Sequence, residues 1–107
     1  DAAWYEQLNA EYRKRKALAG EIFDTLGAKY DPGSRGMFLW GKIGSEWGNG
    51  EKLSDDILQK ARVFITPGFI FGSNGDRYIR ISLCAKQDML KKALERIKRA
   101  LNAEGLK

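Results

Sequence analysis

One arginine, Arg80, interrupts a run of strand-forming apolar residues in the second half of the chain. Residues 78–84 alternate with the period of two that is typical of a β-strand, so Arg80 lies on the face opposite its apolar neighbours Ile79, Ile81 and Leu83. A guanidinium is a permanent cation whose planar donors can hold a carboxylate or phosphate through two parallel hydrogen bonds. Arg80 is therefore a candidate anion-binding residue. The plain alternative is an arginine that is only solvated on the open face of a strand.

Length and composition limit what else the chain can do. With 107 residues, of which 43% are hydrophobic, it has room for a single modest core. One cysteine, Cys84, excludes an internal disulfide, and the lack of histidine removes the usual Cys/His metal sites and histidine-based triads. No apolar run approaches the length of a membrane span, and residues 1–4 lack the layout of a signal peptide. We expect a cytoplasmic protein.

The net charge of +5 could attract nucleic acid or merely solubilise helices. The densest basic run, residues 13–16, falls within a helical pattern, where about 100° of rotation per residue spreads its charges around the axis. We therefore predict solvated helix surface there, and no binding stripe for nucleic acid.

Periodicity and turn residues predict an α+β fold, in which a small, mostly antiparallel sheet packs against helices as a two-layer sandwich. The N-terminal and C-terminal helices are both long, and Gly27 closes the first. The predicted elements are, in chain order, helix 2–26, strands 28–30 and 37–43, a helix from residue 53, a strand ending in residues 66–68, a strand over residues 78–84, and helix 86–102.

The predicted middle helix contains a pair of carboxylates, Asp55 and Asp56. Ser54 is placed to cap this helix, the two aspartates favour the positive end of its dipole, and Leu53 can pack against Leu58. We interpret the pair as part of a helix start, because adjacent carboxylates in a first turn point in different directions.

Both faces of the predicted strand 37–43 are apolar, which is typical of a strand that is covered on both sides. Met37, Leu39 and Ile43 share one face, and Phe38 and Trp40 share the other. A small domain has few elements to cover both faces. We expect the Phe38 face to meet another domain or an active-site cavity; a strand sandwiched within this domain is the alternative.

Short motifs around these strands occur in a characteristic order. Thr-Pro-Gly at 66–68, Phe-Gly at 71–72 and Asn-Gly at 74–75 precede Tyr-Ile-Arg-Ile-Ser-Leu at 78–83, and Gly-Met-Phe-Leu-Trp at 36–40 lies upstream. With these motifs, nearly the whole chain resembles the C-terminal small domain of the fold-type I pyridoxal-phosphate aminotransferases of class I/II, the aspartate aminotransferase superfamily.

The resemblance implies specific roles. Arg80 would hold the α-carboxylate of an amino-acid or 2-oxo-acid substrate, Phe38 would line the pocket with Trp40 as a further candidate, and Gly72 and Asn74 would set the geometry of the turn. Pyridoxal 5'-phosphate would be bound mainly by a separate, larger domain that supplies the Schiff-base lysine. This chain would then contribute no catalytic, cofactor-binding or metal residue.

The resemblance also implies that residues 1–107 are one domain of a longer, homodimeric enzyme. In the family a long helix runs from the large domain into the small one, and the abrupt start at Asp1 suits a helix cut within its length. We therefore expect the gene to continue upstream. The isolated domain would be inactive.

Parts of the sequence also suggest three other functions. Residues 36–42 have the G-x-x-x-x-G-K spacing of a phosphate-binding loop, but Ile43 replaces the magnesium-binding hydroxyl and bulky strand formers fill the middle. Phe38, Trp40 and Arg80 could instead serve a small basic RNA-binding module, since exposed rings on a sheet stack on bases. A free-standing interaction domain without catalysis is the third possibility.

Overall fold

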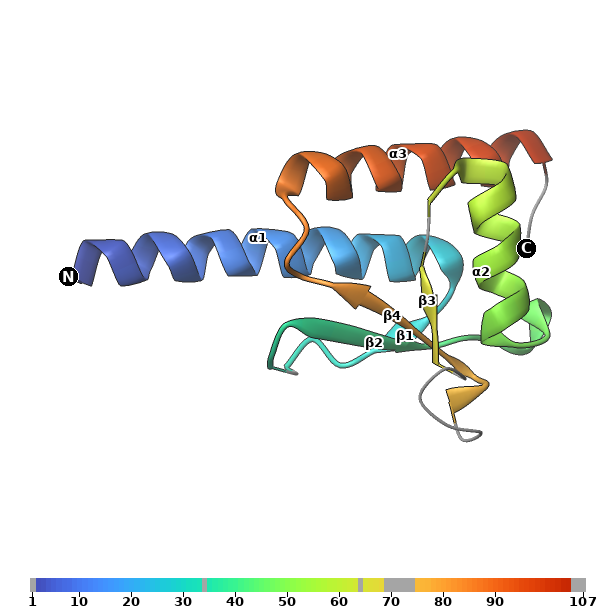
Figure 1. The fold of residues 1–107 in the computed structure, drawn as a ribbon, viewed down its shortest axis with the longest axis horizontal. Coiled ribbons are helices and arrows are strands. Elements are labelled where there is room, and N and C mark those ends of the chain that lie inside the picture. The colour runs from blue at the N-terminus through green and yellow to red at the C-terminus, as the bar shows by residue number, and fades with distance from the viewer. Residues whose placement is uncertain (1, 34, 64, 69–74, 105–107) are drawn as a thin grey trace.

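Three helices and a four-stranded antiparallel sheet form two layers in the computed structural model, which describes residues 2–33, 35–63, 65–68 and 75–104 (Figure 1). The predicted α+β architecture and order of elements are confirmed. The elements are α1 (Ala2–Leu26), β1 (Lys29–Tyr30), β2 (Phe38–Lys42), the short 3-10 helix η1 (Ser45–Trp47), α2 (Gly50–Ala61), β3 (Thr66–Pro67), β4 (Tyr78–Ser82) and α3 (Gln87–Glu104).

The sheet has the strand order β1-β2-β4-β3, and each neighbouring pair is antiparallel. The long central pair is β2 with β4, in a register that places Leu39 opposite Ile81 and Gly41 opposite Ile79. Because side chains alternate along a strand, this register puts the apolar side chains of both strands on the same face. That face packs against the helices.

The core confirms the predicted alternation of residues 78–84. Ile79, Ile81 and Leu83 are all buried, as is Leu39 on β2. Gly41, also on β2, brings the strand close to α1: a Cβ atom there would lie 2.9 Å from the ring of Phe23, which is fully buried. The glycine is thus needed for the close approach of strand and helix.

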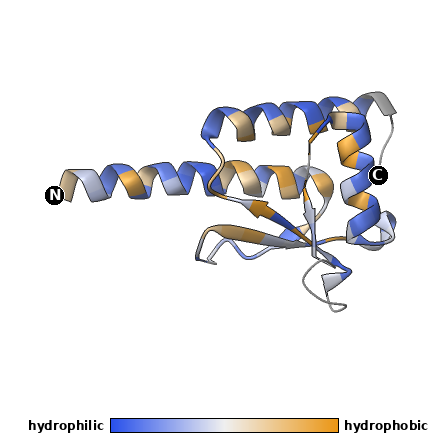
Figure 2. Cartoon of the chain, in the orientation of Figure 1, coloured by the Kyte–Doolittle hydropathy of each residue, from blue (hydrophilic) through white to orange (hydrophobic). Residues whose placement is uncertain are grey.

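Helix α1 matches the predicted range and ends at Gly27, whose φ of 75° is left-handed. Its buried residues all lie in its C-terminal part, and Figure 2 shows the apolar colouring gathered there. The N-terminal part projects beyond the rest of the chain (Figure 1). Trp4, Tyr5 and Leu8 on this part are more than half exposed, so the predicted apolar stripe is only partly covered by the described residues.

The predicted start of the middle helix is wrong. Helix α2 begins at Gly50, and Asn49 caps it by accepting a hydrogen bond from the backbone N–H of Lys52 (2.8 Å). Ser54 lies inside the helix, where its buried hydroxyl donates to the carbonyl of Ile65 (2.6 Å). Asn49 is as good a cap as serine and comes earlier, so the helix starts one turn before the predicted position.

This hydrogen bond predicts that Ser54→Ala lowers the free energy of unfolding by about 1–2 kcal/mol, because it leaves a buried carbonyl without its partner. Urea denaturation of the variant measures the loss. Ser45→Ala, on an exposed serine of η1, is the matched control and should change the stability by less than about 0.5 kcal/mol. Equal stability of the two variants would contradict a structural role for the Ser54 hydroxyl.

Candidate functional site: an arginine on an aromatic sheet face

Arg80 lies near the middle of the sheet, on the face that points away from the core. It is opposite Trp40 on β2 and opposite Thr66 on β3. Phe38 is opposite Ser82, two residues further along β4, and is therefore a diagonal neighbour of Arg80. Antiparallel pairing thus brings together three side chains that are up to 42 residues apart in the sequence.

The guanidinium of Arg80 lies over the ring of Phe38, with its Cζ atom 4.0 Å from the ring centroid. The ring of Trp40 is further away, at 5.8 Å. A cation at these distances is attracted by the negative face of an aromatic ring. The rings therefore orient the guanidinium and hold it against the sheet.

Phe38 and Trp40 are 41% and 40% exposed, although both are large and apolar. Within the described residues this face of β2 is therefore only partly covered, which disagrees with a strand sandwiched inside the domain. Phe38 and Trp40 line a hollow of about 280 Å³ together with Asp31, Arg35, Gly36 and Met37. An exposed aromatic surface beside an arginine is suited to bind an anionic ligand that has an apolar part.

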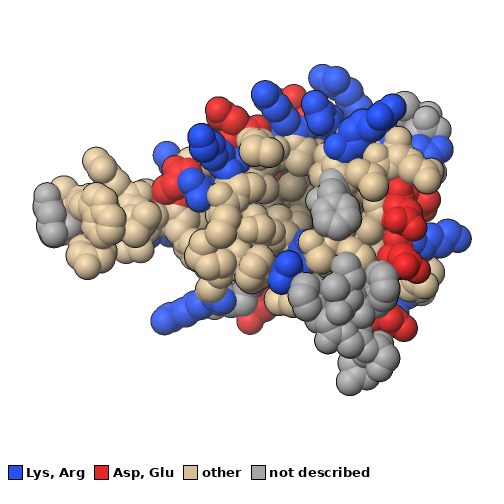
Figure 3. Space-filling view, viewed as in Figure 1, with Lys and Arg blue, Asp and Glu red and all other residues tan. Residues whose placement is uncertain are grey.

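A larger groove, of about 590 Å³, adjoins Arg80 between β4 and α3. Three more cations line it: Arg62, Lys92 and Arg96. Apolar residues complete most of the lining, and no acidic residue is among the described ones. Figure 3 shows Lys and Arg side chains gathered along the α3 side of this view, where the surface is hollowed beneath them. The surroundings of Arg80 thus favour a negatively charged ligand.

Comparison with known proteins decides the family. A family model described as aminotransferase class I and II matches residues 1–97. The chain belongs to this family. The family assignment that was expected from the motifs is therefore confirmed.

Individual relatives agree with the aminotransferase assignment. Transaminase BacF of Bacillus subtilis is 38% identical over 95 residues, which cover 88% of this chain and 24% of BacF. The crystal structure of an aromatic aminotransferase from Pyrococcus horikoshii has a TM-score of 0.81 at 28% identity, and the match covers 100% of this chain and 29% of that one. Cystalysin from Treponema denticola, whose structure contains pyridoxal 5'-phosphate, shares the fold with a TM-score of 0.76 at 21% identity, over 94% of this chain and 26% of that one. The chain spans about a quarter of the length of the curated relatives it matches.

Two sequence motifs remain to be placed in the structure: the turn before β4 and the run with phosphate-loop spacing. Gly72 and Asn74, the residues expected to shape the turn before β4, lie outside the described residues. The run 36–42, with its phosphate-loop spacing, is mostly the extended strand β2 and does not form a loop before a helix. These residues therefore do not form a phosphate-binding loop.

The described part of the chain contains no group of three or more Cys, Asp or Glu side chains arranged to hold a metal ion. Among the same residues, no helix combines the length and the apolar character that crossing a membrane requires.

The start of β4 is held by Arg77, the residue before the strand. Its backbone carbonyl accepts from the N–H of Ile43 (2.9 Å), and its guanidinium donates to the carbonyls of Ile43 (3.2 Å), Gly44 (2.5 Å) and Gly48. These bonds tie β4 to the loop that leaves β2. Arg77 thus has a structural role at the start of β4.

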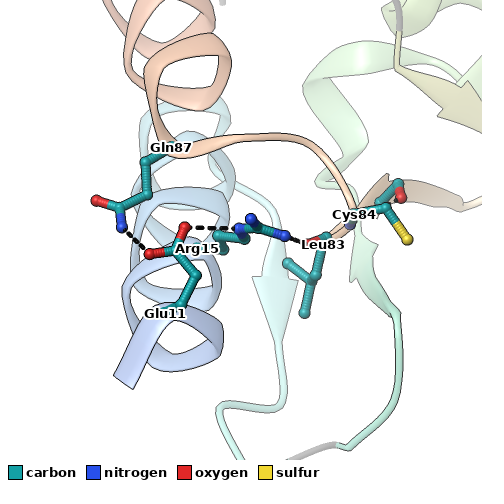
Figure 4. A network of polar contacts seen from close by, with 6 residues as sticks. Glu11, Arg15, Leu83, Cys84 and Gln87 are labelled. Carbon is teal, nitrogen blue, oxygen red and sulfur yellow. Dashed lines mark hydrogen bonds and ion pairs between the residues drawn. The ribbon is translucent and has the colours of Figure 1, made fainter. Parts of the chain in front are cut away.

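The end of β4 is held by a network that sequence reasoning missed (Figure 4). Arg15 on α1 donates through Nε to Glu11 (2.9 Å) and through Nη1 to the carbonyl of Leu83 (3.3 Å). Gln87, at the start of α3, donates to the other oxygen of Glu11 (2.5 Å). The prediction that residues 13–16 are all solvated surface is therefore wrong for Arg15. The spacing of Glu11 and Arg15 could have indicated the ion pair, but no local pattern points to Leu83.

The network lowers the pKa of the Glu11 carboxyl below its ordinary value of 4.5, chiefly because Arg15 donates a hydrogen bond to it and also because Gln87 does. The charge of Lys14 acts in the same direction. Ionised Glu11 therefore stabilises the fold above pH 4.5, and this contribution is lost as the pH falls through the lowered pKa.

We predict that acidification below pH 4.5 destabilises the wild type more than a Glu11→Gln variant, because glutamine does not titrate. The measurement is the free energy of unfolding from denaturant titrations at several pH values between 7 and 3 for both proteins. Glu6→Gln, on an exposed glutamate of the projecting part of α1, is the matched control and should follow the wild type. Identical pH profiles for wild type and Glu11→Gln would show that the network contributes nothing.

Proposed function

We propose that this chain is the C-terminal small domain of a pyridoxal-phosphate-dependent aminotransferase, and that Arg80 binds the α-carboxylate of its amino-acid and 2-oxo-acid substrates. The observation that carries the proposal is the Arg80 guanidinium, held 4.0 Å over the ring of Phe38 on the sheet face that points away from the core. Membership of the class I and II aminotransferase family supports amino-group transfer as the reaction of the longer protein.

In the proposed mechanism, Arg80 binds and orients. Two parallel hydrogen bonds from its planar fork fix both the position and the rotation of the carboxylate. The α C–H bond is then held where a base from the larger domain can remove the proton, and such positioning makes a large contribution to rate. Phe38 would contribute in two ways: its ring orients the guanidinium, and its exposed side chain lines the hollow beside Trp40.

The residues described here fit the substrate end of such a site better than the cofactor end. They provide an oriented arginine beside exposed rings, whereas the Schiff-base lysine and the residues that hold the cofactor phosphate are proposed to come from the larger domain. When bound, pyridoxal 5'-phosphate supplies the electron sink that makes loss of the α-proton possible. The groove lined by Arg62, Lys92 and Arg96 adds positive charge around Arg80, which favours entry of an anionic substrate.

The proposal extends to the longer protein. The covered share of its relatives, about a quarter, is consistent with one domain of a larger enzyme. We propose that this enzyme is a cytoplasmic homodimer, as the family resemblance implies. The uncovered apolar residues of α1, Trp4, Tyr5 and Leu8, would then pack against the larger domain.

An RNA-binding module would use the same exposed rings, and it is the second candidate function. The feature that favours it is the pair of half-exposed aromatic residues beside Arg80 on one sheet face. Titration of the chain with mixed-sequence RNA at moderate salt distinguishes the two functions, since the aminotransferase proposal expects no binding.

We predict that Arg80→Lys in the longer protein lowers kcat/KM for an amino acid and 2-oxo acid pair by roughly 100-fold, because lysine keeps the charge but cannot form two parallel bonds. Cofactor binding, followed by the visible absorbance of the protein, should be unchanged. Arg99→Lys, on the exposed surface of α3, is the control and should have wild-type kinetics. Undiminished turnover in Arg80→Lys would remove the proposed role.

The contact between Arg80 and Phe38 gives a second prediction. Phe38→Leu keeps an apolar side chain but removes the ring face, so KM should rise about threefold with little change in kcat. Phe38→Tyr keeps the ring and should stay close to wild type. Leu58→Met, at a similarly exposed apolar position on α2, controls for a general effect of substituting an exposed apolar side chain. If leucine and tyrosine at position 38 gave equal KM values, the ring face would have no role in binding.

A further inference from the structure

We propose that Arg15 on α1 is a positioning residue for Arg80: its hydrogen bond to Leu83 holds the end of β4 and thereby sets where the Arg80 guanidinium lies. The inference rests on the proposed role of Arg80 in binding the substrate carboxylate. Arg15 itself would not touch the substrate.

The argument begins with the backbone of Leu83, which is held from two sides. Its N–H donates to the carbonyl of Met37 (2.7 Å), the residue directly before β2, and its carbonyl accepts from Arg15 (3.3 Å). Its side chain is 2% exposed in the core. This one residue therefore connects β4, the start of β2 and helix α1, as Figure 4 shows for the bond to Arg15.

Helix α1 holds the start of β2 as well. The hydroxyl of Tyr12 donates to the carbonyl of Gly36 (2.8 Å), two residues before Phe38. Tyr12 and Arg15 are three positions apart and so lie on the same side of the helix. Both strand ends that meet where Phe38 pairs with Ser82 are thus anchored to one side of α1.

Arg15 is well oriented for this task because it is itself held by two helices. Glu11 on α1 accepts from its Nε atom, and Gln87 on α3 holds Glu11 in turn. A side chain that is already ordered loses less conformational entropy when it makes a further hydrogen bond. The Arg15 side chain is 25% exposed, so water competes only partly for its hydrogen bonds.

The distance to the site is short enough for this anchor to matter. Leu83 is three residues from Arg80, which is about 10 Å along a strand. A bidentate fork must be placed to within about 0.5 Å, and its ring contact with Phe38 depends on the relative position of the same two strand ends. Loosening these ends would therefore weaken carboxylate binding before it disrupts the fold.

The test is steady-state kinetics of the longer protein carrying Arg15→Gln, compared with wild type. We expect KM for the carboxylate substrate to rise about tenfold while kcat stays within about twofold, because orientation is lost and the chemical step is not. Arg15→Lys, which can still donate to the Leu83 carbonyl, should recover part of the affinity. Arg13→Gln, an exposed arginine on the same helix, is the matched control and should have no effect.

A merely structural role predicts a different pattern: a lower melting temperature and a smaller active fraction, hence reduced kcat with KM unchanged. That result would overturn the proposal. If Arg15→Gln fails to fold, Glu11→Ala tests the same anchor, because it removes the carboxylate that orients the Arg15 guanidinium, and an unchanged KM there would overturn the proposal.

A double-mutant cycle separates this inference from the proposed function. In an Arg80→Lys background, Arg15→Gln should raise KM by much less than tenfold, since the fork that it positions is already absent. Additive effects would show that Arg15 does not act through Arg80. If Arg80→Lys alone leaves kcat/KM unchanged, the proposed role of Arg80 fails; if Arg80→Lys lowers kcat/KM and Arg15→Gln leaves KM unchanged, only the positioning role fails.

Discussion

The antiparallel pairing of β2 with β4 is the constraint on which the candidate site depends. Its register puts Trp40 opposite Arg80 and Phe38 opposite Ser82, and this alone brings the guanidinium to 4.0 Å from the Phe38 ring centroid. A slip of one residue would turn Arg80 toward the core and Ile79 toward solvent. The cost of burying an unpaired charge, together with the exposure of apolar surface, excludes that register. The packing of the core therefore also determines on which face of the sheet Arg80 lies.

The helices secure this pairing from the other side of the sheet. Phe23 on α1 packs against β2 where Gly41 leaves room for its ring, and Trp47 in η1 donates to the carbonyl of Leu26 at the end of α1 (2.8 Å). Arg77 and Arg15 then hold the two ends of β4 through backbone carbonyls. Arg80 lies between these two ends of β4, on the sheet face that points away from the core. Arg77 and Arg80, beside and on the same strand, thus have different contacts: Arg77 donates to backbone carbonyls, and Arg80 lies over an aromatic ring.

The family membership of the chain and its exposed apolar side chains are consistent with a domain that supplies only part of an enzyme's active site. The chain spans about a quarter of the length of its curated relatives. Among the described residues, exposed large apolar side chains gather on the sheet face around Phe38 and on the projecting part of α1, and Leu58 and Met89 are exposed elsewhere. In soluble proteins, contiguous apolar surface of this kind marks a place where another domain or a ligand is bound. The domain proposed here would supply a preorganised grip for a carboxylate, and the remaining chemistry would belong to the rest of the protein.

Local sequence patterns determined much of this result. Alternation in residues 78–84 located the strand, separated Arg80 from the apolar face and matched the buried positions, and periodicity with a terminal glycine located α1. The motifs around Arg80 and Phe38 were enough to indicate the family. Such features are readable because strand and helix periods and turn residues act between neighbours in the chain.

The tertiary structure alone decided the features that depend on distant partners. Ser54 was expected to cap a helix, but its hydroxyl meets the carbonyl of Ile65 because the helix begins earlier, at a cap provided by Asn49. Arg15 was expected to be solvated, and its partner Leu83 is 68 residues away. The contact of Arg80 with Phe38 likewise follows from strand register. A side chain's type states which bonds it can form, but only the packed fold determines which partner is within reach.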